Sequence, residues 1–348
     1  MIYLLQVIAI SKGCAKPLDA NEKNSPSRKA LNRLNELICD EQNGALLAIN
    51  SDLETSIRQN LSESENGFYE QQMLMFLRLT KQRHMRLNCK NIPIFAEEGN
   101  KIEDFSNVSQ ILIEQNEINN TSSWNDFYKH EPYTHESGEI SIQRFDRLER
   151  RELNQRIGKG EKWKEFEDLM HIPIFWSQRI RLIDPYFIMN SHKNASNSNN
   201  STEIESALDR LIDTIIRIRK KKGTPLRELE IIVHHLFKNS NPKNSISFEE
   251  TRNHVMASIA KFDDITKWIE KFSFRVYKNA VFNTKGKERL LIFEYSSSGF
   301  CFPATKGIVV DSDGYFKEDL EFLSPVSQEK CIEWKDSIRK HCELVDTT

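Results

Sequence analysis

Four residues in the second half of the chain are of types that do acid–base or phosphate chemistry. Asp184 follows the apolar run Ile180–Ile183, and the next residue is a proline, which cannot continue a central strand. His234 and His235 lie in a second apolar run, and Arg289 opens a third. Carboxylates and imidazoles act as acids and bases, and a guanidinium can bind phosphate through two parallel hydrogen bonds. These four residues are the candidates for a nuclease with a non-standard site.

A structural explanation stays open for the acid and the histidines. An aspartate at the end of a strand can bond to the backbone of its own turn. Adjacent residues on a strand point to opposite faces, so at most one of His234 and His235 can serve a given site. The sequence therefore does not choose between a catalytic and a structural role for Asp184.

Two clusters of cations could bind phosphate. They are Lys220, Lys221 and Lys222 at the end of an expected helix, and Lys285, Lys287 and Arg289 before and at the start of a late strand. If both clusters meet at one edge of a sheet, they form a phosphate-binding patch. The alternative, weighed equally, is a helix C-terminus that its dipole makes favourable for cations, together with an exposed hairpin.

Two further groupings are weaker. The segment 128–136 places two histidines, two glutamates and two tyrosines in one proline-containing loop, but nothing fixes a ligating geometry, so no metal is predicted. Glu228 and Glu230 could join Asp184 in a restriction-type site, yet no lysine lies two residues beyond either glutamate. Phosphate-cradling glycine loops, nucleophile elbows and zinc-protease motifs are missing from the sequence, and no cofactor is predicted.

Composition limits the classes of function. Across 348 residues, 49 basic and 51 acidic side chains give a net charge of −2, so no overall field attracts nucleic acid or anionic lipid. Any such binding must come from a local patch. Six scattered cysteines without metal spacing suggest reduced thiols in a cytosolic protein. The apolar opening, Ile2–Ile10, is too short to span a bilayer and lacks the features of a signal peptide, so no membrane insertion is expected.

Periodicity predicts an α/β protein of two domains with a connector. Residues 1–115 read as a smaller α/β or α+β domain with strands over 2–10 and 108–113 and a helix over 27–41. The run 45–49 is strand or buried helix, and 68–87 is dense in Met and Leu. Residues 116–170 read as a charged helical connector, since their acids nearly match their bases.

Residues 171–348 read as a mixed sheet flanked by helices in the order βαβαβββα. Strands are expected at 180–183, 229–236, 272–277, 289–295 and 300–310. Helices are expected at 204–222, 255–269 and 327–344. Such alternation places helices on the faces of a sheet.

The segment from Ile172 to Phe316 resembles a single phospholipase-D-like module, similar to the C-terminal domain of MIT-domain proteins. The resemblance rests on the strand that ends in Asp184-Pro185-Tyr186, on the order of elements, and on the late charged triplet Lys287-Glu288-Arg289 followed by Lys306-Gly307. Active members of that superfamily carry a His-x-Lys pair, in which the histidine attacks the phosphate. No histidine in this sequence is followed two residues later by lysine.

The resemblance therefore implies binding in place of hydrolysis. Lys287 stands where the histidine would be, and a protonated lysine is a poor nucleophile. We expect a non-catalytic component that binds a phosphodiester backbone or a partner protein, in a context such as a mobile-element or antiviral-defence system. The nuclease and a lipid-binding adaptor are the alternatives, and a homodimer is left open.

Overall fold

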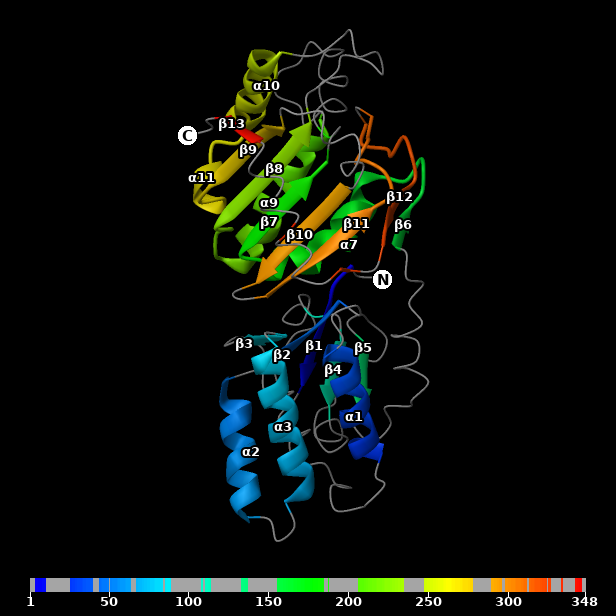
Figure 1. Ribbon diagram of the computed structural model, residues 1–348, viewed down its shortest axis with the longest axis vertical. Coiled ribbons are helices and arrows are strands. Elements are labelled where there is room, and N and C mark those ends of the chain that lie inside the picture. The colour runs from blue at the N-terminus through cyan, green and yellow to red at the C-terminus, as the bar shows by residue number, and fades with distance from the viewer. Residues whose placement is uncertain are drawn as a thin grey trace. The chain divides into compact units, whose positions relative to one another are not determined.

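The chain forms two compact units, Tyr3–Glu152 and Leu153–Thr348, each with a sheet of its own (Figure 1). The computed structural model describes residues 4–10, 26–39, 44–49, 51–63, 67–83, 85–88, 108, 110–113, 133–136, 155–184, 187, 206–234, 247–277, 289–295, 298–311, 313–323, 325–326, 333 and 342–345. Residues 153–170, predicted as part of the connector, belong to the second unit. Described elements within them pair with and pack on that unit, as set out below.

The N-terminal unit is built on a parallel sheet in the order β3-β2-β1-β4-β5. The strands are β1 (Gln6–Ile10), β2 (Ala45–Ile49), β3 (Arg86–Asn88), β4 (Gln110–Ile113) and β5 (Tyr133–Glu136). All five side chains of β2 are buried, as in parallel strands covered on both faces, which explains why its sequence does not alternate. The described strands of this unit make it α/β. β5 occupies the end of the segment predicted as a histidine-rich loop.

The described helices that accompany this sheet are α1 (Pro26–Cys39), α2 (Ser51–Glu63) and α3 (Phe68–Gln82). The apolar stripe expected for the first of them is buried, namely Leu31, Leu34, Leu37 and Ile38. α3 buries Met73, Phe76 and Leu77, so one face of the Met/Leu-rich run belongs to the core, while Met75 is exposed.

The C-terminal unit is a mixed α/β layer structure around an eight-stranded sheet in the order β13-β9-β8-β7-β10-β11-β12-β6. Its strands are β6 (Gln155–Ile157), β7 (Arg179–Ile183), β8 (Glu228–His234), β9 (Phe272–Tyr277), β10 (Arg289–Tyr295), β11 (Ser298–Ala304), β12 (Leu320–Phe322) and β13 (Cys342–Val345). β7, β8 and β9 are parallel, and the remaining neighbours are antiparallel. The helices among the described residues are α7 (Trp163–Trp176), α9 (Ala207–Lys222), α10 (Phe248–Ala260) and α11 (Ile265–Trp268).

α7 and α9 lie behind the sheet in the view of Figure 1. α9 begins with a capping box between Ser206 and Asp209 and ends at Gly223 in the left-handed conformation, as its sequence predicts. Because α9 connects the parallel strands β7 and β8, it runs back along the sheet. Its last turn therefore lies at the end of the sheet where β7 and β8 begin.

Four predicted elements are wrong in extent or type. The helix expected over 255–269 is two helices, α10 and α11, separated by Lys261–Asp264. The strand expected over 300–310 ends at Ala304. Residues 342–345, predicted as helix, form β13 beside β9, and 155–157, predicted as a helical connector, form β6 beside β12. In the last two cases pairing with a distant strand overrides a local helical pattern.

Candidate functional site

Asp184 and Arg289 lie side by side at the end of the sheet where β7 stops and β10 starts. The register pairs Ile183 with Leu290, which places Arg289 next to Asp184 on the neighbouring antiparallel strand. Arg289 Nε lies 3.5 Å from Asp184 Oδ1. The structure thus brings these two predicted site residues together.

Both residues also hold the segment 305–308. Arg289 Nη1 donates to the carbonyl of Thr305 at 3.1 Å, and the amide of Ile308 donates to Asp184 Oδ2 at 3.2 Å. A Cβ added at Gly307 would lie 2.9 Å from Asp184 Oδ2, so only glycine allows this close approach. We call Asp184, Arg289 and residues 305–308 the carboxyl rim.

The carboxyl rim is internally neutralised. Asp184 is buried, at 1% exposure, and Arg289 is about one-fifth exposed. A buried carboxylate with a guanidinium and a backbone amide around it is satisfied as an anion. Lys306 stands on the outside of the same segment, half exposed, with Glu318 Oε2 at 3.7 Å from its Nζ.

The other predicted members of this site lie partly outside the described residues. His235, Lys285 and Lys287 belong to the part of the chain that the structure does not describe. The backbone of His234 pairs with Tyr277 in the β8–β9 ladder. The side chain of His234 also lies outside the part of the chain that the structure describes, so the pairing of a histidine with Asp184 stays a prediction.

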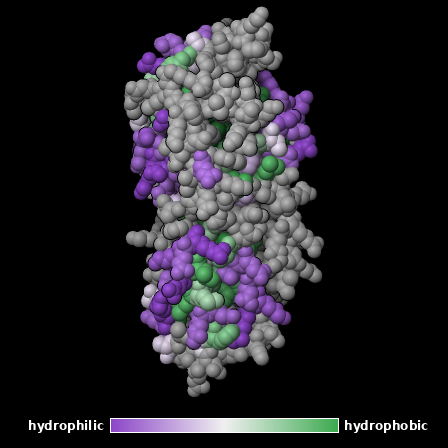
Figure 2. Space-filling model, in the orientation of Figure 1, coloured by the Kyte–Doolittle hydropathy of each residue, from purple (hydrophilic) through white to green (hydrophobic). Residues whose placement is uncertain are grey.

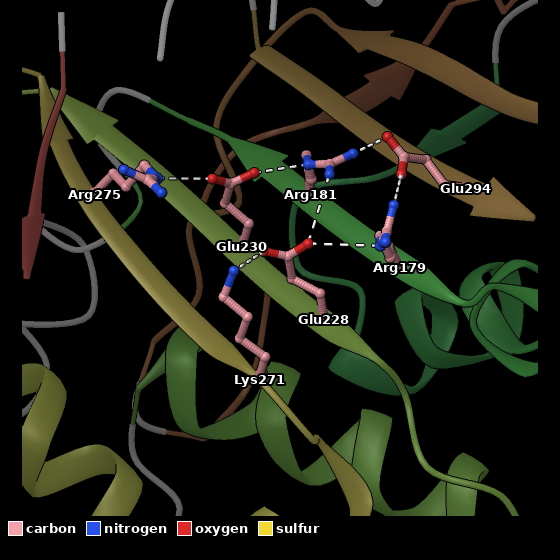
Figure 3. Close-up of polar contacts among 7 residues, drawn as sticks. All are labelled: Arg179, Arg181, Glu228, Glu230, Lys271, Arg275 and Glu294. Carbon is pink, nitrogen blue, oxygen red and sulfur yellow. Dashed lines mark hydrogen bonds and ion pairs between the residues drawn. The ribbon is translucent and has the colours of Figure 1, made fainter. Parts of the chain in front are cut away.

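Seven charged residues form a network across β7, β8, β9 and β10, which we call the charge ladder (Figure 3). Its members are Arg179, Arg181, Glu228, Glu230, Lys271, Arg275 and Glu294. Arg181 is its centre, because it contacts Glu230 at 2.7 Å, Glu228 at 3.7 Å and also Glu294. Glu230 also accepts from Arg275 at 2.8 Å.

The ladder places the two glutamates away from Asp184. Arg181 pairs with Glu230 in register, so both point to one face of the sheet, whereas Asp184, three residues after Arg181, falls on the other. Arg181 is 2% exposed and Glu230 0%, so the ladder neutralises charges inside the protein. Asp184, Glu228 and Glu230 do not form the shared acidic site considered from the sequence.

Lys220, Lys221 and Lys222 lie at the opposite end of the sheet from Arg289. Lys222 Nζ is 5.3 Å from the ring centroid of Phe175, and Arg219 in the same turn donates to the carbonyl of Ser177 at 2.6 Å. These partners precede the first residue of β7, whereas Asp184 follows its last residue. A single phosphate patch made from both cation clusters is therefore ruled out for Arg289 and the three α9 lysines.

Other cations join these lysines where β7, β8 and β9 begin. Arg227 donates its amide to the carbonyl of Gln178 at 2.9 Å, and the carbonyl of Lys271 accepts from Leu229 at 2.9 Å. We call this group the strand-start edge. Its described cations are Arg179, Lys220, Lys221, Lys222, Arg227 and Lys271, and the described acids beside them are Glu228, Asp264, Glu270 and Glu294.

At the strand-start edge, exposed lysines surround buried charged residues that hold them in position. Hydrophilic residues cover the side of the C-terminal unit that carries α11 and the start of β8 (Figure 2). Glu228, 7% exposed, holds Lys271 at 3.0 Å and Arg179 at 3.7 Å, so the charge ladder positions two cations of this edge. Lys220 is 2.6 Å from Asp264 and lowers the pKa of that carboxyl by a hydrogen bond.

Two groups behind the edge have shifted pKa values. Burial lowers the pKa of Arg219 to about 10, and the guanidinium, still protonated, donates to carbonyls at the end of α7, including Phe175 at 2.8 Å. Burial, with a contribution from Lys221, lowers the pKa of His171 to about 4. Arg219 is thus an internal clamp on the last turn of α7, and His171 is neutral at physiological pH.

Sequence reasoning missed Arg179, Arg181, Arg227 and Lys271. A usable signal was present, since Arg-x-Arg at the start of one predicted strand and Glu-x-Glu at the start of the next have opposite charges at the same period of two. On adjacent parallel strands in matching register, as here, these pairs meet. The sequence alone presents the glutamates as catalytic acids.

No protein-family model matches the chain, and a search of curated proteins finds no match to it. Within the described residues, no helix combines the length and apolar character needed to cross a bilayer. The described side chains also include no cluster of three or more His, Cys, Asp or Glu residues placed to hold a metal ion.

Proposed function

We propose that this chain is a non-catalytic binding component whose C-terminal unit, a degenerate phospholipase-D-like module, binds the phosphodiester backbone of a nucleic acid. The observation that carries the proposal is the strand-start edge, where the last turn of α9 and residues at or just before the starts of three strands gather six cations. Such a local patch is what a protein of net charge −2 needs in order to attract a polyanion.

The carboxyl rim supports the non-catalytic part of the proposal. The resemblance to phospholipase D rests on the strand ending at Asp184 and on the late segment that includes Arg289, and these two residues form an ion pair. Asp184 and Arg289 bond to each other and to the backbone of 305–308. A group engaged in this way holds a loop in place and does not offer its charge to an incoming phosphate.

The strand-start edge supports the binding part. Lys221 and Arg227 are exposed, and Lys220 and Lys271 keep about half or more of their side-chain surface exposed. Exposed lysines and arginines release condensed counterions from a nucleic acid when they neutralise its phosphates, and this release supplies affinity without reading sequence. We therefore expect binding that depends on salt and not on base order.

The test is the salt dependence of binding to a labelled oligonucleotide of about 20 nucleotides, followed by fluorescence anisotropy from about 50 to about 200 mM KCl. The double variant Lys221→Ala/Arg227→Ala should lower affinity about tenfold and reduce the slope of log K against log salt by about two. The matched control, Lys306→Ala/Lys317→Ala, removes two exposed cations on and beside the carboxyl rim and should change affinity less than about twofold.

Several results would overturn the proposal. Absent or salt-independent binding removes the nucleic acid as partner, as does a purified protein partner that binds while nucleic acid does not. An equal loss in both double variants removes the strand-start edge as the binding surface. Cleavage of the oligonucleotide that stops on Asp184→Asn would show an enzyme.

A further inference from the structure

Aromatic side chains lie among the cations of the strand-start edge. Trp176, the last residue of α7, meets Phe175 edge to face, with ring centroids 5.2 Å apart at 73°. Lys222 Nζ lies 5.3 Å from the centroid of Phe175 and 5.6 Å from that of Trp176. One lysine of the edge therefore stands over two aromatic rings.

A second tryptophan lies on the same edge. Trp268 ends α11, and its carbonyl accepts from the amide of Leu226, the neighbour of Arg227, at 2.8 Å. Lys267 Nζ lies 5.3 Å from the centroid of the Trp268 ring. Both tryptophans are partly exposed, and each has a lysine ammonium within about 6 Å of a ring centroid.

Tryptophan rings beside cations should distinguish single-stranded from double-stranded nucleic acid. In a duplex the faces of the bases are covered by their neighbours, and only the phosphates are accessible to Lys221 and Arg227. In a single strand the bases can leave the stack and lie on an indole, which adds about tenfold in affinity per stacked base. An ammonium group over the same ring can move to an adjacent phosphate when a base arrives, so its charge is kept in the complex.

We propose that the strand-start edge selects single-stranded nucleic acid, with Trp176 and Trp268 as stacking surfaces and the surrounding lysines on the phosphates. This inference rests on the function proposed above and names its substrate class. It predicts a preference for strands with bases over both duplexes and strands that carry the same phosphates without bases.

The experiment compares three labelled ligands of equal length: a single strand, the matching duplex, and a strand with a run of abasic sites. The unmodified protein should bind the single strand about a hundredfold more tightly than either of the others, with about tenfold from each indole. Trp176→Leu, which keeps an apolar side chain against Phe175, should lose about tenfold of that preference and leave duplex binding within about twofold. Trp176→Phe, which keeps an aromatic face, should restore much of it.

The outcomes separate this inference from the one it rests on. Equal binding of all three ligands, with the Lys221→Ala/Arg227→Ala loss intact, overturns strand selection and leaves the proposed function standing. Failure to bind any ligand removes the proposed function. A single-strand preference that survives on the abasic ligand assigns selection to backbone flexibility and also overturns stacking; this arm needs no variant, so it decides the matter even if Trp176→Leu does not fold.

Discussion

The two ends of the C-terminal sheet both carry cations, but in different surroundings. At the carboxyl rim, Arg289 faces the buried Asp184 and the backbone of Thr305. At the strand-start edge, Lys220 and Lys271 pair with acids while 49% and 61% of their side-chain surface stays exposed. At the carboxyl rim the cation is therefore paired inside the protein, whereas at the strand-start edge the cations remain accessible to a ligand.

The comparison shows why a cluster of cations in a sequence does not identify a binding site. An arginine within a sheet face can place its planar fork between strands and satisfy several acceptors, as Arg181 does with three glutamates. A lysine at the end of a helix or strand keeps its ammonium group in water. If this distinction holds, loss of an arginine at the rim or ladder should reduce stability, and loss of an edge lysine should reduce binding.

The largest expected effect is at the charge ladder. Arg181→Met should lower the free energy of unfolding by about 4 kcal/mol, because it leaves Glu230, which is 0% exposed, without its nearest cation. Urea denaturation of the C-terminal unit measures this loss.

The double variant Arg181→Met/Glu230→Met is the control for the ladder. It removes both buried charges and should recover part of the lost stability, since an apolar pair of similar volume replaces an ion pair at little cost. If the double variant loses as much unfolding free energy as Arg181→Met and Glu230→Met lose together, the two side chains are not coupled. The ladder would then not be the internally neutralised region that contrasts with the strand-start edge.

A smaller loss is expected at the carboxyl rim. Arg289→Met should lower the free energy of unfolding by about 3 kcal/mol, because Asp184 keeps its backbone donor, the amide of Ile308, but loses its guanidinium. Lys221→Ala, at the exposed edge, is the matched control and should change stability by less than about 0.5 kcal/mol. Equal losses in these two variants would break the contrast between the two ends.

The sequence predicted most of the C-terminal sheet, because its central strands are apolar runs bounded by turn residues. The strands 272–277 and 289–295 were predicted at their observed bounds. β6 and β13 were missed because each is a short edge strand whose extended conformation depends on a distant partner, β12 or β9. No local pattern in a single sequence contains that partner.

For the candidate site, the sequence can predict which end of the sheet each cation cluster occupies, but not that Asp184 and Arg289 lie on neighbouring strands. The strand ending at Asp184 and the strand opening at Arg289 were both recognised, but their side-by-side order is a property of the sheet. The sequence leaves the lysines of α9 as partners for Arg289 in one phosphate patch. A helix that connects two parallel strands must, however, run back to the opposite end of the sheet, and this rule, applied to the predicted βαβ unit, separates the two clusters.

A smaller loss of stability than at the ladder or the rim is expected from lowering the pH, and it involves His171. This residue lies on α7 and stacks on Phe175 at the strand-start edge. Burial first, and then Lys221 and Lys164, lower its pKa from 6.5 to about 4. Between these pH values the unfolded chain binds the proton and the folded chain does not, so stability is fully present above about pH 6.5 and falls as the pH drops towards 4. We expect a loss of about 2 kcal/mol at pH 4.5 relative to pH 7.5.

The difference between the unmodified protein and His171→Gln isolates this histidine from the carboxylates that titrate in the same range. That variant should lose this part of the pH dependence. Lys221→Ala should raise the pKa of His171, measured from its imidazole proton resonance, because one of the cations that oppose protonation is gone. A pKa that does not move would place Lys221 too far from His171 to act on it, and the α9 lysines would then have to lie further from α7 than the strand-start edge requires.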